Sequence, residues 1–396
     1  MKKETQIVQA GRNPGKQAGS VNTPIYQTST VIFPTIEDYT SAGKGKLFYS
    51  ENEGGTAVDF SYGIAGTPTT FALQKALKIL EKGDDCVIVP SGLSAITTSL
   101  LAFLKANDHL LMVDSVYGPT RRFCTKILSK LGVEITYYDP LIGGAIKKLV
   151  KKNTKVIFLE SPGSLTFEVQ DVPAIVKVAK SAGITTIIDN SWATPMFFNP
   201  LELGVDVSIQ AITKYIGGHS DLILGAIITK GKAGEEIINA YRNLGITASP
   251  HDCWLALRGL RTMAARLERQ QKSTAKIVSW IKKRPEVTRV LFPADSHDPG
   301  YKLWKKLYKG SASLFSIVLK EKITKKSANK LINSLKLFGI GASWGGYESL
   351  VINFDPSTIR TATKWQEKGQ CIRFYIGLED PDDLIKDLEN GFSKAF

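Results

Sequence analysis

The sequence contains few of the residue types that build metal sites or disulfide frameworks. Its 396 residues include 4 cysteines and 4 histidines, and no two cysteines form a CxxC pair. They are Cys86, Cys124, Cys253 and Cys371, and His109, His219, His251 and His297. This wide spacing indicates neither a disulfide framework nor a zinc site. We therefore expect reduced, mostly buried thiols and no bound metal.

Long apolar runs are also missing. No run reaches the roughly 18 residues that a membrane-spanning helix needs. The first residues, MKKETQIVQAGRNPGK, lack the apolar stretch of a secretory signal. With 43% hydrophobic and 22% charged residues, the composition is that of a soluble globular protein rather than a disordered one. We expect a cytoplasmic location and no membrane partner.

Acidic residues are outnumbered, with 37 Asp and Glu against 51 Lys and Arg, which gives a net charge of +14. Such a charge permits nucleic-acid binding, but no recognition helix, zinc finger or RNP-type motif accompanies it. The lysines occur in short groups beside apolar residues, as in KLWKKLYK, and this spacing is typical of the solvated faces of amphipathic helices. We expect no nucleic-acid partner.

The chain divides into three parts by its pattern. Residues 1–60 have little apolar periodicity and several turn signals, which indicates an extended arm that packs on something else. Residues 61–255 alternate short β-branched apolar runs with helical stretches, the pattern of an α/β domain whose parallel sheet is covered on both faces. Residues 256–396 have more strands than crossover helices, which indicates a smaller α+β domain. In parallel sheets, ligands bind beyond the carboxyl ends of the strands.

Two of the predicted strands end in residues suited to covalent and electrostatic chemistry. Lys214 follows Thr213 at the end of an apolar strand and precedes a Gly-Gly turn. A partly desolvated amine can form a Schiff base with a carbonyl, and the neighbouring hydroxyl can hold a phosphate, although a surface lysine is the simpler alternative. Asp189 ends the run ITTIID and would need a partner if buried. A protonated pyridine nitrogen is one such partner, and a structural carboxylate capping the next turn is the alternative.

Two further turns have weaker signals. Ser91 and Gly92 lie between a strand and a helix, where glycine allows close approach and free N–H groups can bind phosphate. Many α/β proteins contain such a turn. Tyr117, in DSVYGPTR, follows another strand, where its ring could stack on a planar cofactor or be an ordinary turn residue.

Together these features resemble the fold-type I enzymes that depend on pyridoxal 5′-phosphate (PLP), specifically the transsulfuration, or Cys/Met metabolism, family. The stretch DVSIQAITKYIGGHS matches that family's PLP-lysine signature, and the resemblance extends over essentially the whole chain. It implies a large, mostly parallel seven-stranded sheet domain and a smaller C-terminal α+β domain. It also implies that Lys214 carries PLP and moves protons, that Asp189 pairs with the pyridine nitrogen and that Tyr117 stacks on the ring. The phosphate would be bound by Gly92, the Leu93 N–H, Thr213 and Tyr62.

The resemblance also implies a substrate site and partners. Arg373, in CIRFYIGLED, matches the arginine that binds the substrate carboxylate, and Ser343 would assist it. Tyr62 begins YGIAGTPT, which is similar to the segment that reaches into the neighbouring subunit's phosphate site. The active site would then need at least a dimer, with the arm of residues 1–60 contacting the neighbour, and the family suggests a homotetramer.

Two segments are similar to the β-lyase branch of the family. LESPGSLTFEVQDVP occupies the place where γ-enzymes usually read E-x-P-x-N-P, and Trp344 lies in Ser-Trp-Gly-Gly where γ-enzymes usually have Ser-Leu-Gly-Gly. Trp344 would form a wall of the substrate pocket. The branch implies β-elimination of L-cystathionine to L-homocysteine, pyruvate and ammonia, a step toward methionine, and activity on other cysteine S-conjugates. The alternative is a γ-synthase or γ-lyase of the same family.

One departure from the family pattern concerns the phosphate. The family usually has an arginine two residues after Tyr62, and this sequence has Ile64. A charge-assisted hydrogen bond of about 1.5–3 kcal/mol would be lost there. Ala211, often serine in relatives, removes another possible donor.

Overall fold

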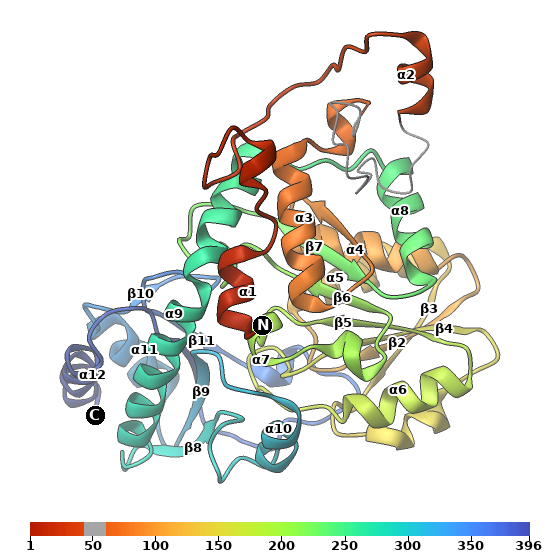
Figure 1. Ribbon diagram of the computed structural model, residues 1–396. Coiled ribbons are helices and arrows are strands. Elements are labelled where there is room, and N and C mark those ends of the chain that lie inside the picture. The colour runs from red at the N-terminus through yellow and green to blue at the C-terminus, as the bar shows by residue number, and fades with distance from the viewer. Residues whose placement is uncertain (43–60) are drawn as a thin grey trace.

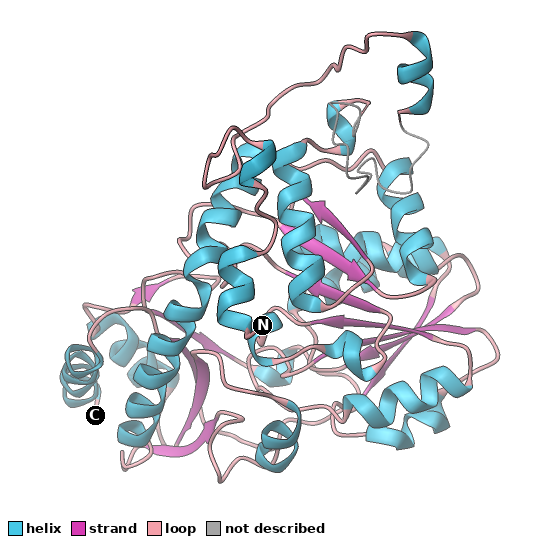
Figure 2. Cartoon of the chain, in the orientation of Figure 1, coloured by secondary structure: helices cyan, strands magenta, loops and turns pink. Residues whose placement is uncertain are grey.

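The structure, a computed structural model, describes residues 1–42 and 61–396 (Figure 1). A seven-stranded sheet forms the centre of the molecule and a five-stranded sheet lies beside it (Figure 2). Every residue of β2 (His109–Val113) and β7 (Gly225–Thr229) is buried, so both faces of the large sheet are covered. No helix in the described residues is long and apolar enough to cross a membrane.

The large sheet has the order β1-β7-β6-β5-β4-β2-β3. Its other strands are β1 (Asp85–Val89), β3 (Glu134–Tyr138), β4 (Thr154–Glu160), β5 (Thr185–Asp189) and β6 (Val207–Gln210). Strand β7 runs antiparallel to both of its neighbours, and the remaining pairs are parallel. The helices of this part are α3 (Pro68–Glu81), α4 (Gly92–Phe103), α5 (Gly118–Lys126), α6 (Val172–Ser181), α7 (Thr194–Phe197) and α8 (Ala233–Asn243).

The smaller sheet has the order β10-β11-β12-β9-β8 and is antiparallel except for the β10–β11 pair. Its strands are β8 (Val287–Leu291), β9 (Leu314–Leu319), β10 (Gly339–Ile340), β11 (Leu350–Phe354) and β12 (Cys371–Tyr375). The helices near it are α10 (Tyr301–Leu307), α11 (Lys325–Ser334) and α12 (Pro381–Ala395). The predicted fold class, a mostly parallel seven-stranded sheet with a smaller α+β unit, is confirmed.

The long helix α9 (Pro250–Ile281) joins the two parts. Its first half, including Leu260, belongs to the large hydrophobic core, whereas Ile277 and Ile281 belong to a separate core under the smaller sheet. The predicted boundary between residues 255 and 256 falls inside this helix. The division into domains at that position stays a prediction.

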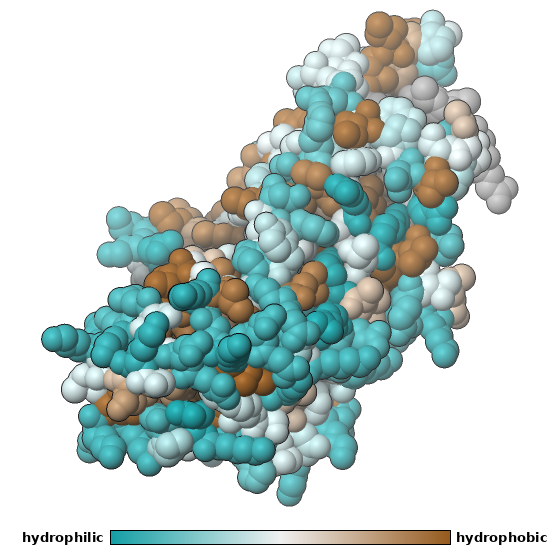
Figure 3. All heavy atoms as spheres, turned by 90° about the vertical axis from the view of Figure 1, so that its left-hand side faces the viewer, coloured by the Kyte–Doolittle hydropathy of each residue, from teal (hydrophilic) through white to brown (hydrophobic). Residues whose placement is uncertain are grey.

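The predicted N-terminal arm has two kinds of segment. Helix α1 (Lys3–Gln9) packs on its own chain, where Ile7 is fully buried and Arg261 donates to the carbonyls of Ile7 and Ala10. Helix α2 (Ile36–Ser41) lies away from the rest of the molecule, at the top of Figure 1. Ile32 and Ile36 are 91% and 67% exposed, and apolar atoms gather at the same tip in Figure 3. Residues 43–60 of the arm lie outside the described residues, and its contact with a neighbour stays a prediction.

A buried carboxylate, Glu81 at the end of α3, connects the strands that lead to the predicted site. Its oxygens accept from Gln210 at the end of β6, from Asn190 just after β5 and from Ser208. Burial raises the pKa of this carboxyl, against the opposing effects of these hydrogen bonds and of the Lys3 ammonium. The folded protein therefore holds a proton on Glu81 to a higher pH than the unfolded chain does.

Glu81→Gln should stabilise the protein in alkaline solution. The unfolded chain ionises Glu81 near its ordinary pKa, so the wild type loses stability as the pH rises from there through the folded pKa. We expect the thermal midpoint of the variant to exceed the wild-type value by about 2–5 °C at pH 8.5 and by much less at pH 5.5. Glu134→Gln, on the exposed edge strand β3, is the matched control. A gap that is equal at both pH values would contradict this account.

Candidate active site

The predicted site residues meet at the carboxyl ends of the parallel strands. Asp189 is the last residue of β5, and Tyr117 immediately precedes α5, in the turn after β2. The strand predicted to run to Lys214 is too long, because β6 ends at Gln210 in the structure. Backbone bonds from Lys214 N to Ala211 O (3.0 Å) and from Gly218 N to Lys214 O (2.8 Å) replace the ladder with a tight turn. Lys214 and Tyr117 both interact electrostatically with Asp189, so the structure brings these three residues together.

The Lys214 amine is half-buried beside polar groups. Its Nζ donates to Ser343 Oγ and lies 5.1 Å from the centroid of the Trp344 ring. Burial lowers the pKa of this amine to about 8; the Arg373 cation adds to the effect and Asp189 opposes it. A lowered pKa makes the neutral amine available near neutral pH, which carbonyl addition requires.

The Asp189 carboxylate has no cation paired with it among the described residues. Its Oδ1 accepts from Ser191 N at 2.9 Å, and burial raises its pKa despite this hydrogen bond and the attraction of Lys214. A buried carboxylate in this state gains most from a cationic partner, such as a protonated ring nitrogen.

The start of α4 provides free backbone donors. Ser91 caps the helix by accepting from Ser94 N at 2.9 Å, and the N–H groups of Gly92 and Leu93 have no acceptor in the described part of the chain. A Cβ at Gly92 would lie 2.7 Å from the Ala211 Cβ, so only glycine allows this close approach to the turn before Lys214. The two amides can hold an anion at a helix N-terminus.

Two of the predicted phosphate ligands, Thr213 and Tyr62, already interact with other residues of the chain. Thr213 Oγ1 donates to Leu224 O and accepts from Leu224 N, both at 3.1 Å, so its hydroxyl hydrogen is already used. Tyr62 is 51% exposed and pairs with Thr30 in an isolated antiparallel β-bridge. Within the described residues, no hydrogen bond joins Tyr62 to Lys214 or Asp189. Neither role is tested by this geometry, and both stay predictions.

The predicted substrate residues come from the smaller unit and lie near Lys214: Arg373 is in β12, and Ser343 and Trp344 are in the loop between β10 and β11. Arg373, in the middle of β12, is 4% exposed and donates to Ser343 O (3.0 Å) and Gly341 O (3.3 Å). Its Nε is buried without a partner, and no carboxylate pairs with the guanidinium among the described residues. Burial lowers the pKa of Arg373 to about 10. A buried cation that lacks an anion is suited to binding the carboxylate of a ligand.

The Ser-Trp-Gly-Gly segment packs directly on Lys214. A Cβ at Gly345 would lie 2.6 Å from the Lys214 Cα, which explains the glycine at this contact. Ser343 adopts a φ of +76°, and Trp344 lies 5.3 Å from the Tyr215 ring. This segment therefore sets the position of Trp344 beside the amine.

Sequence reasoning missed Glu160, the last residue of β4. Its Oε2 accepts from Tyr117 N at 2.8 Å, and burial and the neighbouring Asp189 raise its pKa well above the ordinary value. The available signal was its place at the end of the apolar run KVIFLE, which parallels that of Asp189 in ITTIID.

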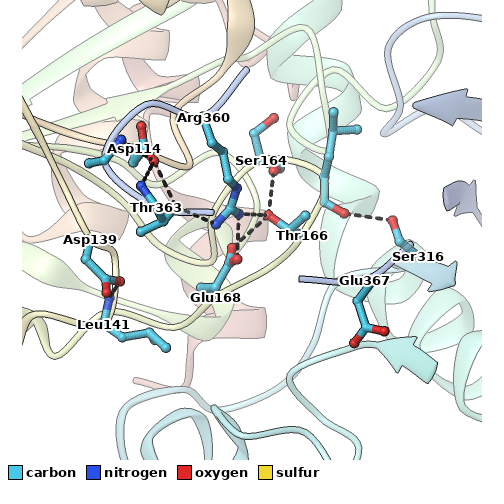
Figure 4. A network of polar contacts seen from close by, with 12 residues as sticks. Asp114, Asp139, Leu141, Ser164, Thr166, Glu168, Ser316, Arg360, Thr363 and Glu367 are labelled. Atoms are coloured by element: carbon cyan, nitrogen blue, oxygen red, sulfur yellow. Dashed lines mark hydrogen bonds and ion pairs between the residues drawn. The ribbon is translucent and has the colours of Figure 1, made fainter. Parts of the chain in front are cut away.

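Residues 360–363, which lie between β11 and β12, form a strap that joins the smaller unit to the larger one (Figure 4). Asp114, which follows β2, accepts from the backbone and side chains of Thr361 and Thr363, while Arg360 pairs with Glu168. Burial opposes ionisation of Asp114, but these bonds and Arg121 outweigh it and lower its pKa. A cavity of about 250 Å³ opens beside the strap, and neither Lys214 nor Asp189 lines it. The strap therefore joins the smaller unit to the larger one through Asp114 and Glu168.

Residues 4–393 match the family described as Cys/Met metabolism PLP-dependent enzyme. The chain belongs to this family. It is 43% identical over 395 residues to an L-alanine/L-glutamate racemase of Wolbachia pipientis, covering 100% of this chain and 98% of that one. It is 41% identical over 403 residues to the cystathionine β-lyase MetC of Escherichia coli, covering 99% and 98%. The crystal structure of metB from Corynebacterium glutamicum has a TM-score of 0.89 at 29% identity, covering 100% and 99%.

PLP is accordingly the cofactor, and the residues present fit it. The fit rests on a half-buried amine of lowered pKa and, within the described residues, on a half-buried carboxylate without a paired cation and two free amides at a helix start. These match the aldehyde, the pyridine nitrogen and the phosphate in turn. The protein is a PLP-dependent enzyme.

Proposed function

We propose that the protein is a carbon–sulfur β-lyase that converts L-cystathionine and water to L-homocysteine, pyruvate and ammonia, a step toward methionine. The observation that carries this proposal is the indole of Trp344, held beside the Lys214 amine by a Ser-Trp-Gly-Gly segment similar to that of β-lyases. The similarity to a named cystathionine β-lyase along the whole chain supports it. Other cysteine S-conjugates, which share the Cβ–S bond, are expected to be accepted as well.

In this proposal the chain's own residues bind the substrate and move its protons. Bound PLP supplies the electron sink for the electrons left at Cα. Arg373 binds the α-carboxylate through its guanidinium, and Ser343 helps to orient the Cα–H bond toward Lys214. The Lys214 Nζ takes the Cα proton and returns a proton to the departing sulfur. Asp189 stays charged and keeps the proton on the pyridine nitrogen, while the phenol of Tyr117 covers the ring.

The rival within the family is a γ-lyase or γ-synthase. A γ-lyase would cleave L-cystathionine on the other side of the sulfur and release cysteine and 2-oxobutyrate. Chromatography of the thiols released by the PLP-loaded protein separates the alternatives. Homocysteine is expected, and cysteine would overturn the assignment of Trp344.

A second candidate activity is racemisation of alanine or glutamate, favoured by the similarity to the Wolbachia racemase. Racemisation also begins when Lys214 removes a Cα proton, but then returns a proton to the opposite face. Tyr117 is the candidate donor there, because it lies at the same site on a different element. Incubation of L-alanine in D₂O followed by chiral chromatography tests it. D-Alanine formation at a rate comparable to cystathionine cleavage would support this activity.

We further propose a homotetramer in which Tyr62 and the arm complete the neighbouring subunit's site. The exposure of Tyr62 and of the apolar arm residues supports this proposal. Light scattering should give a mass near four subunits, and a stable monomer with full activity would contradict it.

Ile64→Arg should tighten PLP binding. A guanidinium at this position would add a charge-assisted bond to the phosphate, and such bonds contribute about 1.5–3 kcal/mol. We expect the dissociation constant for PLP, from absorbance titration of apoenzyme, to fall by about 10- to 100-fold. Ile64→Leu is the control and should change nothing. An unchanged constant for Ile64→Arg would mean that another group already supplies this charge.

A further inference from the structure

A second carboxylate lies beside Asp189 at the strand ends. Glu160 and Asp189 are paired residues of the parallel strands β4 and β5, so their side chains leave the same face of the sheet. The Glu160 backbone is also fixed, because its N–H donates to Gln170 Oε1 at 3.1 Å. Gln170 is fully buried and donates in turn to the Tyr138 hydroxyl at 3.2 Å. These bonds fix the Glu160 backbone at the end of β4, and the bond from Tyr117 N holds its side chain.

The Glu160 side chain anchors the turn that carries Tyr117. Its Oε2 accepts from Tyr117 N at 2.8 Å, immediately before α5 begins. Tyr117 makes no hydrogen bond through its own hydroxyl in the described residues and is 44% exposed. The position of the phenol ring thus depends on its backbone, and that backbone is held by Glu160.

The charges around Glu160 do not favour its ionised form. The titratable groups facing it are Asp189 from β5 and Tyr117, with Tyr138 of β3 reached through Gln170. No cation pairs with Glu160 in the part of the chain that the structure describes, whereas Asp189 interacts with Lys214. Arg122 acts on Tyr117 rather than on Glu160. When two buried carboxylates share a site, only the one with the better cationic partner stays ionised.

We propose that Glu160 is a positioning residue that works in its neutral, protonated form, holding Tyr117 over the cofactor and leaving the negative charge to Asp189. A carboxylic acid keeps a carbonyl oxygen that accepts from Tyr117 N, so positioning needs no charge. The neutral form also removes the repulsion that a second carboxylate would exert on Asp189. This inference rests on the proposed roles of Asp189 and Tyr117 in PLP binding, but not on the choice between β-lyase and racemase.

The test compares Glu160→Gln with Glu160→Ala in the PLP-loaded enzyme. Gln keeps an oxygen acceptor without a charge, whereas Ala leaves Tyr117 N unpaired. The readouts are the visible circular dichroism of bound PLP, which reports the orientation of the ring, and the dissociation constant for PLP. Neither readout requires a substrate, so both survive a failure of the β-lyase assignment. Glu134→Gln, exposed on β3, is the matched control and should equal the wild type.

We expect Glu160→Gln to keep the dichroism within about twofold and the PLP constant within about threefold of the wild type. Glu160→Ala should lose more than half of the dichroism and bind PLP at least about tenfold more weakly. A Gln variant as defective as the Ala variant would overturn the proposal, because a charge would then be required. An Ala variant equal to the wild type would overturn the positioning role. If the Ala variant does not fold, the Gln variant decides alone.

Discussion

Replacing Lys214 with alanine is expected to reduce kcat/KM for L-cystathionine by on the order of 10⁴-fold, the upper range for loss of a proton-transferring group. The same change should abolish the visible absorption band that arises from the bond between Nζ and PLP. Both effects follow from one amine, which is half-buried, has a pKa lowered to about 8 and lies beside Ser343. Among the described residues, no other lysine donates a hydrogen bond to Ser343.

Lys177→Ala, on the exposed side of α6, controls for the loss of a surface lysine and should retain full activity. Added methylamine tests the role of the missing amine directly, since a small amine can occupy the space of the lost side chain and recover part of the rate. A Lys214→Ala protein that keeps both its absorption band and its turnover would contradict the assignment.

Replacing Arg373 with methionine should lower kcat/KM by about 10²- to 10³-fold, because truncating one partner of a buried, hydrogen-bonded charge pair costs about 2–5 kcal/mol. The loss should appear mainly as a higher KM, since the carboxylate is bound both before and during the reaction. The absorption of bound PLP should not change, because in the proposed function Arg373 binds the substrate and not the cofactor. Saturation kinetics with L-cystathionine, together with an absorption spectrum, measures both.

Arg373→Lys should fall between the wild type and the methionine variant. Lysine keeps the positive charge but loses the fork that donates to the carbonyls of Gly341 and Ser343. In the proposed function the same fork binds both carboxylate oxygens of the substrate. If the methionine variant showed an ordinary KM for L-cystathionine, Arg373 would not be the carboxylate ligand.

Much of the fold could be predicted from the sequence because local patterns determine it. The runs that end in Asp189 and Glu160 are mostly apolar and β-branched, so they predict buried parallel strands, and the structure has them as β5 and β4. Strand β7 was not predicted, because nothing local in GAIIT shows that it runs antiparallel between β1 and β6. The strand predicted through Lys214 was too long, because the turn depends on Gly217 and Gly218 and on packing against Gly345.

The sequence predicted which residues form the site, but it did not predict how they contact one another. The resemblance to the family indicated Lys214, Asp189 and Arg373. The hydrogen bonds that hold the surrounding strand ends and turns, however, join residues far apart in the chain. Glu81 reaches Gln210 across 129 positions, and Glu160 reaches Tyr117 across 43. Such pairs have no local signature, because burial and partner are set only when the sheet is assembled.

The most direct test of the central claim is the keto acid that the purified, PLP-loaded protein releases from L-cystathionine. Lys214→Ala protein provides the blank, and chromatography of the derivatised keto acids gives their identity without a coupling enzyme. The account predicts pyruvate, with homocysteine and ammonia in equal amounts. Release of 2-oxobutyrate with cysteine would contradict it and would assign the protein to the γ-lyase branch.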